Sequence, residues 1–294
     1  MDSSSPVVVA EVGCNHRGDF DCAVEMVRVA AEVCSADVVK FQKRHSRSLL
    51  SEAEYDAPHP NPVHAFGETY GAHREYLEFS LVQHRELKAA CEAVGVAYAT
   101  SVWDIVSARE IVKIEPVLLK VPSACNLDSE LMEFLASDFG GQIHVSVGMT
   151  SRSEEEDLVR FLVDRGRGPD TVLYACTSGY PVPFEDVALL EIPRLIDAYG
   201  SSLAAIGFSG HHLGIAVDVA ALALGAAWFE RHFTLDRTWR GTDHAASLEP
   251  DGLRRLCRDM KHVSLSLTPK REEILEIEQG QRAKLKRNLA PAQP

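Results

Sequence analysis

Eight short apolar segments alternate along the chain with segments of helical periodicity, and no linker interrupts the series. Runs that are apolar at almost every position, such as 7–13, are typical of parallel strands buried on both faces. Strict alternation favours a parallel sheet of the α/β class, and eight repeats predict closure into a (β/α)8 TIM barrel. A doubly wound open sheet is the alternative fold. The expected strands are, in chain order, 7–13, 38–42, 96–102, 117–123, 143–148, 172–178, 203–209 and 228–234.

Most connections between the expected elements are short, but a long polar segment, 43–79, follows the second strand. Connections of this length are more often functional loops than bland links. We therefore expect one barrel domain over 1–266 with an insertion at 43–79, and a short C-terminal helix and tail over 267–294. The expected helices are one that starts after a cap at Asp19, then 81–94, 105–114, 127–137, 154–165, 189–199, 213–224 and 251–265.

Composition narrows the class of protein. The 294 residues are 46% hydrophobic and carry a net charge of −13, which disfavours a nucleic-acid surface because such a surface is basic. No apolar run is long enough for a membrane helix, and the first residues do not resemble a signal peptide. The seven scattered cysteines contain no CxxC pair and are typical of reduced thiols. We expect a cytoplasmic protein with no nucleic-acid or membrane partner.

Polar side chains at the ends of the expected strands predict an anion site. The active sites of TIM barrels lie at the carboxyl ends of the strands. Lys40 and Lys120 lie within apolar strands, where an ammonium group is costly unless it meets an anion. Hydroxyl donors at or after other strand ends could complete a phosphate cradle. They are Ser123, Ser146 and Ser209. The alternative interpretation is that the lysines pair with structural carboxylates and the serines cap helices.

Two histidines predict a metal site at the same end of the barrel. His211 and His232 belong to consecutive expected strands, and Glu11 and Asp243 also fall near strand ends. Such a set would suit a divalent metal with open coordination positions. A histidine in an apolar strand is, however, more often a satisfied interior group. We expect the other histidines near this end to be solvated loop residues, namely His212, His244 and those between 43 and 84.

With these residues in hand, the sequence resembles the N-acetylneuraminate (sialic acid) synthase family over nearly the whole barrel. The resemblance implies a TIM barrel that condenses phosphoenolpyruvate with an aldose, such as N-acetylmannosamine. It implies that phosphate is released, that a 2-keto-3-deoxy sugar acid is formed, and that a divalent ion is used, usually Mn2+, with Mg2+ or Co2+ as alternatives. The matching motifs are AEVGCNHRGD, VKFQK, LKVPSACN, SVGM, CTSGYPVP, GFSGHH, ERHFTLD and GTDHAASLEP.

The resemblance also implies roles for individual residues. His211 and His232 would bind the metal, and Glu11, Asp243 and Tyr180 would act at the reacting centre. The residues that would hold the phosphate and carboxylate of phosphoenolpyruvate are Lys40, Lys120, Ser123, Ser146, Ser178 and Ser209.

Three positions depart from the family pattern. Gly210 stands where the family usually has Asp, Ser178 where it has Asn, and Cys125 where a carboxylate helps to bind the sugar. The chain also ends at Pro294, where most members continue into an antifreeze-like (SAF) domain that contributes an arginine to the acceptor sugar. We therefore expect an unusual or modified aldehyde acceptor. A homodimer formed through barrel helices is the default expectation for assembly.

Two alternative functions stay open on the sequence. One is a related 2-keto-3-deoxy acid synthase with a phosphorylated acceptor, such as those making octulosonate 8-phosphate or arabino-heptulosonate 7-phosphate. That enzyme would need arginines at the barrel mouth, and the candidates are Arg44, Arg47 and Arg74. The other is a non-catalytic barrel that binds a sugar or a phosphate.

Overall fold

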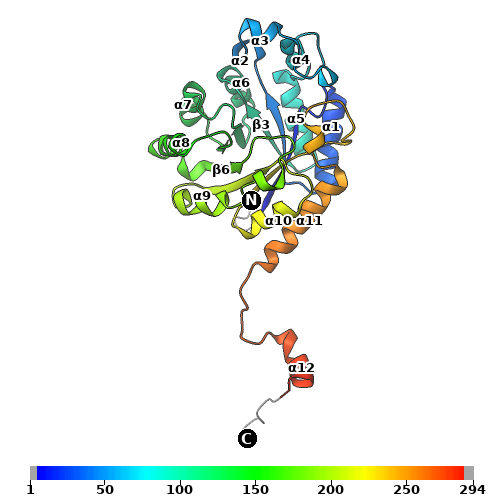
Figure 1. Cartoon of the computed structure of the whole chain (residues 1–294), viewed down its shortest axis with the longest axis vertical. Coiled ribbons are helices and arrows are strands. Elements are labelled where there is room, and N and C mark those ends of the chain that lie inside the picture. The colour runs from blue at the N-terminus through cyan, green and yellow to red at the C-terminus, as the bar shows by residue number, and fades with distance from the viewer. Residues whose placement is uncertain (1–4, 288–294) are drawn as a thin grey trace.

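A computed structural model describes residues 5–287 of the chain. Its eight parallel strands are paired in sequence order, and β8 pairs with β1, so the sheet closes into a barrel as predicted (Figure 1). The open sheet is therefore excluded. The strands are β1 Val7–Gly13, β2 Val38–Lys43, β3 Ala97–Val102, β4 Leu118–Val121, β5 Gln142–Ser146, β6 Thr171–Cys176, β7 Ala205–Gly210 and β8 Trp228–His232.

Helices surround the barrel on its outer side, and most lie within a few residues of their expected bounds (Figure 1). Asp19 caps α1 as expected, since its side chain accepts a hydrogen bond from the backbone N–H of Cys22. The α-helices of the barrel are α1 Phe20–Arg28, α5 Leu81–Ala93, α6 Ile105–Ile111, α7 Ser129–Asp138, α8 Arg152–Asp164, α9 Glu191–Tyr199, α10 Ala216–Ala223 and α11 Pro250–Ser266.

The barrel interior has an apolar layer and a charged layer. Alternate residues of a strand point to the same side, so Val7, Val9 and Glu11 of β1 share the inward face. The first two belong to a small apolar cluster that fills the amino-terminal half of the barrel, together with Val38 and Trp228. Glu11 and its counterparts on other strands lie one layer further along. Along β1, the change from Val7 and Val9 to Glu11 thus marks the boundary between the apolar core and the charged layer of the barrel.

Strand register brings charged residues of neighbouring strands side by side. Glu11 is paired with Lys40 across β1 and β2 and with His232 across β1 and β8. Ser209 is paired with Glu230 across β7 and β8. Residues that are hundreds of positions apart in sequence therefore meet at one end of the barrel.

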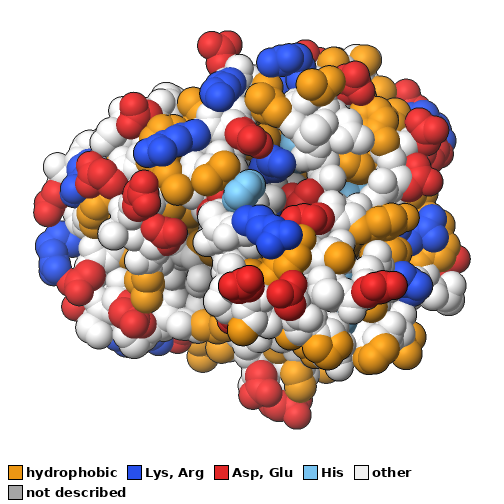
Figure 2. Space-filling view, turned by 90° about the horizontal axis from the view of Figure 1, so that it is seen from above, with side chains coloured by type: hydrophobic (Ala, Val, Ile, Leu, Met, Phe, Trp, Pro, Cys, Tyr) orange, Lys and Arg blue, Asp and Glu red, His pale blue; other side chains and the backbone are white. Residues whose placement is uncertain are grey.

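The insertion after β2 is folded into short helices. These are α2 Ser46–Leu49, α3 Glu52–Asp56, the 3-10 turn Pro62–His64 and α4 Tyr70–Tyr76. They lie at one end of the view in Figure 1, and Figure 2 shows the molecule from that side. Acidic and basic side chains are interspersed on this face, so it carries no continuous band of positive charge.

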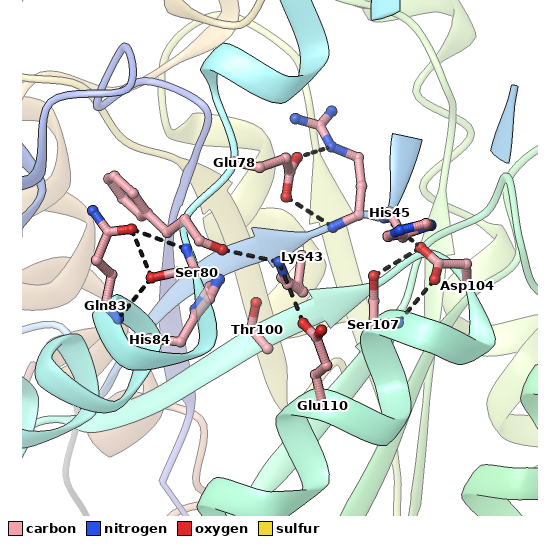
Figure 3. A network of polar contacts seen from close by, with 12 residues as sticks. Lys43, His45, Glu78, Ser80, Gln83, His84, Thr100, Asp104, Ser107 and Glu110 are labelled. Atoms are coloured by element: carbon pink, nitrogen blue, oxygen red, sulfur yellow. Dashed lines mark hydrogen bonds and ion pairs between the residues drawn. The ribbon is translucent and has the colours of Figure 1, made fainter. Parts of the chain in front are cut away.

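Both ends of the insertion are tied to the barrel (Figure 3). The Lys43 ammonium group donates to the Phe79 carbonyl at 2.9 Å and forms an ion pair with Glu110 at 3.5 Å. The backbone N–H of His45 donates to Asp104 at 2.8 Å. The insertion is therefore fixed at its two ends rather than joined to the barrel by a loose hinge.

The chain leaves the barrel after α11. The last helix, α12 Glu276–Leu285, lies apart from the barrel at the end of an extended segment (Figure 1). Among residues 5–287, no helix combines the length and apolar character needed to cross a membrane.

Candidate active site

A cavity of about 290 Å³ lies at the carboxyl ends of the strands, where barrel active sites are found. It collects residues from all eight strands and the segments after them. The predicted site residues that line it are Glu11, Lys40, Lys120, Ser123, Ser146, Ser178, Tyr180, Ser209, His211 and His232. Asp243 is the exception, because it lines an adjoining cavity that shares His232 and Tyr180 with the first.

Both predicted lysines meet carboxylates. The Lys40 ammonium group lies 2.6 Å from Glu11 and 3.6 Å from Glu230, and the Lys120 ammonium group lies 2.9 Å from Glu230. All four side chains are buried. Glu230 joins the two lysines, yet it was not among the predicted site residues. The available signal was its position two residues before His232, which places both side chains on the inward face of β8.

The charges of this cluster affect one another. Burial alone would lower the pKa of Lys40, but Glu11 and Glu230 outweigh burial and raise it. Burial together with Lys40 lowers the pKa of Lys120, although Glu230 opposes them. Burial raises the pKa of Glu11 despite Lys40. Burial would also raise the pKa of Glu230, but the two lysines hold it below its usual range. Glu11 is therefore the carboxylate that takes up a proton more easily.

Hydroxyl groups surround one backbone N–H group beside the lysines. The Gly148 N–H donates to the Ser123 hydroxyl at 3.0 Å. A Cβ at Gly148 would come within 2.5 Å of the Ser178 hydroxyl and 2.8 Å of the Ser123 hydroxyl, so glycine permits this close approach. Ser209 donates to Glu230 at 3.3 Å, and Ser146 is buried nearby. Hydroxyls from separate strands thus form a small polar cradle, of the kind that suits an anion.

The two predicted metal ligands lie side by side. The ring centres of His211 and His232 are 5.4 Å apart. The Nδ1 atom of His211 lies 3.0 Å from the Thr177 carbonyl, so it carries the proton and leaves Nε2 as an acceptor. Burial, with His232 nearby, lowers the pKa of His211 to about 3. Among residues 5–287, the buried Nδ1 atom of His232 has no hydrogen-bond partner, and Asp243 lies 3.8 Å away.

This donor set fits a divalent ion only in part. Two imidazoles in their neutral form would supply two nitrogen ligands. Within residues 5–287, no group of three or more His, Cys, Asp or Glu side chains is arranged to hold a metal. Glu11, which the sequence predicted near the metal site, forms an ion pair with Lys40 instead. An ion bound here would need water or substrate oxygens for its other positions.

Other side chains complete the cavity. The Tyr180 ring lies 4.2 Å from the His211 ring and 5.6 Å from the His232 ring, and it is half exposed. It therefore covers the histidine pair on the solvent side. Ser101 accepts a hydrogen bond from Lys40 at 2.7 Å, and Gln42 donates to Glu11 at 3.0 Å. Both residues lie near the ends of their strands, β2 and β3, but neither was predicted as a site residue.

The prediction that the remaining histidines are solvated is correct for His45, which is exposed, but wrong for most of the others. His212 is fully buried behind the barrel wall, where Asp218 and Arg231 contact its Nε2 atom. His244 is buried and lies 2.8 Å from the Thr234 hydroxyl. Within 43–84, the buried histidines are His59, His73 and His84. These buried histidines pack against neighbouring aromatic rings or make polar contacts that the sequence alone does not reveal.

Fold and site together define a TIM-barrel protein with a lysine and hydroxyl cradle beside two imidazoles. A model of the NeuB family matches residues 26–272, and the chain belongs to this family. Human N-acetylneuraminate-9-phosphate synthase is 36% identical over 96% of this chain and 77% of its own length. The N,N'-diacetyllegionaminic acid synthase of Campylobacter jejuni is 31% identical, over 89% and 77% of the two chains.

A solved structure supports membership of the same family. The N-acetylneuraminic acid (sialic acid) synthetase of Leptospira borgpetersenii, determined in complex with citrate, superposes with a TM-score of 0.81. It is 28% identical, and the match covers 97% of this chain and 94% of that one. These findings confirm the family resemblance, and the chain is a sialic-acid-synthase-like enzyme.

Proposed function

We propose that this enzyme condenses phosphoenolpyruvate with an aldose or a sugar-derived aldehyde, giving a 2-keto-3-deoxy sugar acid and inorganic phosphate. The observation that carries the proposal is that two buried lysines, a hydroxyl cradle and two histidines line one cavity. The lysines and hydroxyls suit the anionic phosphoenolpyruvate, and the histidines beside them suit the aldehyde. The names of the relatives, which are synthases of such sugar acids, support the same activity.

In this proposal the phosphate and carboxylate groups of phosphoenolpyruvate bind Lys40, Lys120 and the cradle hydroxyls. Glu230 already holds Lys120 at 2.9 Å and Lys40 at 3.6 Å, so the ammonium groups are positioned before the substrate arrives. Charge-assisted hydrogen bonds from such fixed donors are stronger than neutral ones. The same donors stabilise the negative charge on the phosphate as it leaves.

The reaction balances with water as the third reactant. Carbon 3 of phosphoenolpyruvate forms a bond to the aldehyde carbon, and a water oxygen adds to carbon 2. The bond between carbon 2 and the bridging oxygen then breaks, which releases phosphate and leaves the 2-keto group. Glu11 or Asp243 accepts one proton of the water and passes it to the aldehyde oxygen, which becomes a hydroxyl group, and the second proton of the water leaves with the phosphate. A divalent ion held by His211 and His232, proposed to be Mn2+ with Mg2+ or Co2+ as alternatives, would polarise the aldehyde oxygen.

The test is phosphate release from phosphoenolpyruvate in the presence of Mn2+, across a panel of aldoses and their phosphates. Wild type is expected to release phosphate only when a suitable aldose is present. Lys120→Met should lower kcat/KM by about 100-fold or more, since it removes a buried cationic donor. Lys113→Gln, a change at an exposed lysine outside the cavity, is the matched control. Absence of release with every aldose would refute the proposed activity.

A further inference from the structure

A layer of aromatic side chains inside the barrel lies directly beneath the charged layer of the cavity. Residues on the inward face of a strand recur at every second position. On β6 they are Val172, Tyr174 and Cys176, of which the first two belong to the small apolar cluster of the barrel and the third lines the cavity. Tyr174 is completely buried and does not line the cavity itself. It therefore forms the boundary between the apolar core and the charged groups.

The ring of Tyr174 supports Lys120 from below. The Lys120 ammonium nitrogen lies 3.6 Å from the centre of this ring and 2.9 Å from the Glu230 carboxylate. A cation over the face of an aromatic ring is attracted by the ring, and the attraction is larger when both groups are shielded from water, as they are here. An ammonium group has three N–H donors, so the carboxylate and the ring leave one for a ligand in the cavity.

His144 fixes the orientation of the tyrosine ring. The Tyr174 hydroxyl lies 2.8 Å from Nδ1 of His144, and Nε2 of His144 lies 3.4 Å from the side-chain oxygen of Gln142. Because an amide oxygen only accepts, Nε2 carries the proton, and Nδ1 accepts a hydrogen bond from the tyrosine hydroxyl. A phenol that donates in this way has a more electron-rich ring, which strengthens the attraction for the Lys120 ammonium group.

Packing restricts the ring from its other sides. Tyr174 is paired with Gly207 across β6 and β7, and a Cβ at Gly207 would lie 2.7 Å from two carbon atoms of the ring. Glycine thus lets the ring lie close against β7. The Trp228 ring meets the His144 ring edge-on, with 4.5 Å between their centres. The tyrosine is therefore held in place without any ligand, as a supporting residue of a binding site should be.

The alternative interpretation is that Tyr174 only fills the core of the barrel. Phenylalanine would fill nearly the same space, however, and a buried hydroxyl and imidazole are costly in an apolar layer unless they meet. The structure places this polar pair beside the lysine, since His144 is paired with Lys120 across β4 and β5. The chain also offers a reference pair. The Tyr98 hydroxyl lies 2.8 Å from Nδ1 of the buried His84, in the larger hydrophobic cluster outside the cavity.

We propose that Tyr174 is a positioning residue for phosphoenolpyruvate: its ring, oriented by His144, holds the Lys120 ammonium group where it meets the substrate. The inference rests on the proposed function, in which Lys120 binds phosphoenolpyruvate. Without the ring, the ammonium group would be free to move away from the cavity. The other titratable groups that act on Lys120 are Glu230, Lys40 and Cys176.

The test is calorimetric titration of the enzyme with phosphoenolpyruvate in the absence of an aldose, so that no turnover occurs. Tyr174→Leu should weaken binding by about 10- to 30-fold, the range expected for a cation–ring contact shielded from water. Tyr174→Phe should weaken it by only about 3-fold, because the ring is kept and only the bond to His144 is lost. In turnover assays, KM for phosphoenolpyruvate should rise in Tyr174→Leu, with KM for the aldose unchanged.

A double-mutant cycle separates positioning of Lys120 from a general effect on packing. In the Lys120→Met background, Tyr174→Leu should cause no further loss of phosphoenolpyruvate binding, because the tyrosine acts through the lysine. Losses that add would overturn the inference. Tyr98→Leu and Tyr98→Phe are the matched controls, since they make the same changes in the reference pair, and both should bind phosphoenolpyruvate as wild type does.

Thermal unfolding shows which variants are folded. If Tyr174→Leu is not, the comparison of Tyr174→Phe with Tyr98→Phe decides, and equal affinity in these two variants would overturn the inference. Wild-type affinity in a folded Tyr174→Leu variant would overturn it as well, and would leave the proposed function standing. Absence of phosphoenolpyruvate binding by the wild-type enzyme would overturn both.

Discussion

At the scale of single residues, the sequence predicted the side chains whose sequence environment is unusual. It missed side chains whose residue type and environment are common. Lys40 and Lys120 were predicted because an ammonium group within an apolar strand needs an explanation. Glu230 was missed although it bridges both lysines, because a sequence does not tell which carboxylate meets which cation. Gly210, one of the three positions singled out in the sequence, lies at a closely packed place in the structure. A Cβ there would lie 2.8 Å from the Phe208 ring and 2.9 Å from the His212 ring.

The histidine pair makes a prediction about metal affinity. Replacing His211 or His232 with alanine should weaken Mn2+ binding at least about 100-fold, because each change removes one of two nitrogen donors. Titration of free Mn2+ by electron paramagnetic resonance measures this without any turnover. His262→Ala, at an exposed position on α11, serves as the control. Unchanged affinity in both site variants would rule out the proposed ligands.

At the scale of elements, the strands were predictable because each is a short apolar run, whose ends are marked by polar residues. The insertion was predicted only as a polar loop. Its helices are too short for a hydrophobic period to show, and they depend on caps and on contacts with one another. One cap could have been recognised: Ser51 and Glu54 form a capping box at the start of α3. The position of α4 over α3, which places Arg74, has no such local signal.

Close packing of α3 against α4 makes a prediction about the insertion. A Cβ at Gly71 would lie 2.2 Å from the ring of Tyr55, so Gly71→Ala should force the two helices apart at a cost of about 1–3 kcal/mol. Hydrogen exchange in 52–76 should become faster, while the barrel strands stay protected. Gly140→Ala is the control, because a Cβ there meets nothing within 4 Å. Unchanged exchange in both variants would show that the insertion is not held by this contact.

At the scale of the whole molecule, eight-fold alternation predicted the closed barrel, because the pattern is repeated in every unit. Burial of histidines was not predictable, since it depends on how loops fold over one another. The result is a set of neutral histidines inside the protein. Burial lowers the pKa of His16, His84 and His211 to about 3 and that of His73 and His244 to about 4.

These histidines predict a loss of stability in mild acid. Between about pH 6.5 and pH 3–4 the unfolded chain binds more protons at these sites than the folded chain, so the free energy of unfolding falls as pH falls. Each histidine contributes on the order of 1–2 kcal/mol of this loss by pH 5. Glu11 and Asp37 act in the opposite direction, since burial raises the pKa of each carboxyl group, but they are two groups against these five histidines.

Urea unfolding at pH 7.5 and pH 5 measures the effect. The urea midpoint of wild type should be lower at pH 5 than at pH 7.5. His84→Gln should reduce this difference, because it removes one buried histidine, whose Nδ1 atom is hydrogen-bonded to the Tyr98 hydroxyl at 2.8 Å. His262→Gln, at an exposed site, should leave the difference unchanged. Equal stability at the two pH values would contradict the account of buried neutral histidines.

The central claim is that the lysine cradle supports attack on carbon 2 of phosphoenolpyruvate, and an oxygen label tests it most directly. Phosphoenolpyruvate labelled with 18O at the bridging oxygen is converted with an active aldose, and the products are separated by mass spectrometry. Cleavage between carbon 2 and oxygen predicts that the label leaves with inorganic phosphate, while the new keto oxygen comes from water. Label retained in the keto acid would mean that the bond to phosphorus breaks, which would contradict the proposed mechanism.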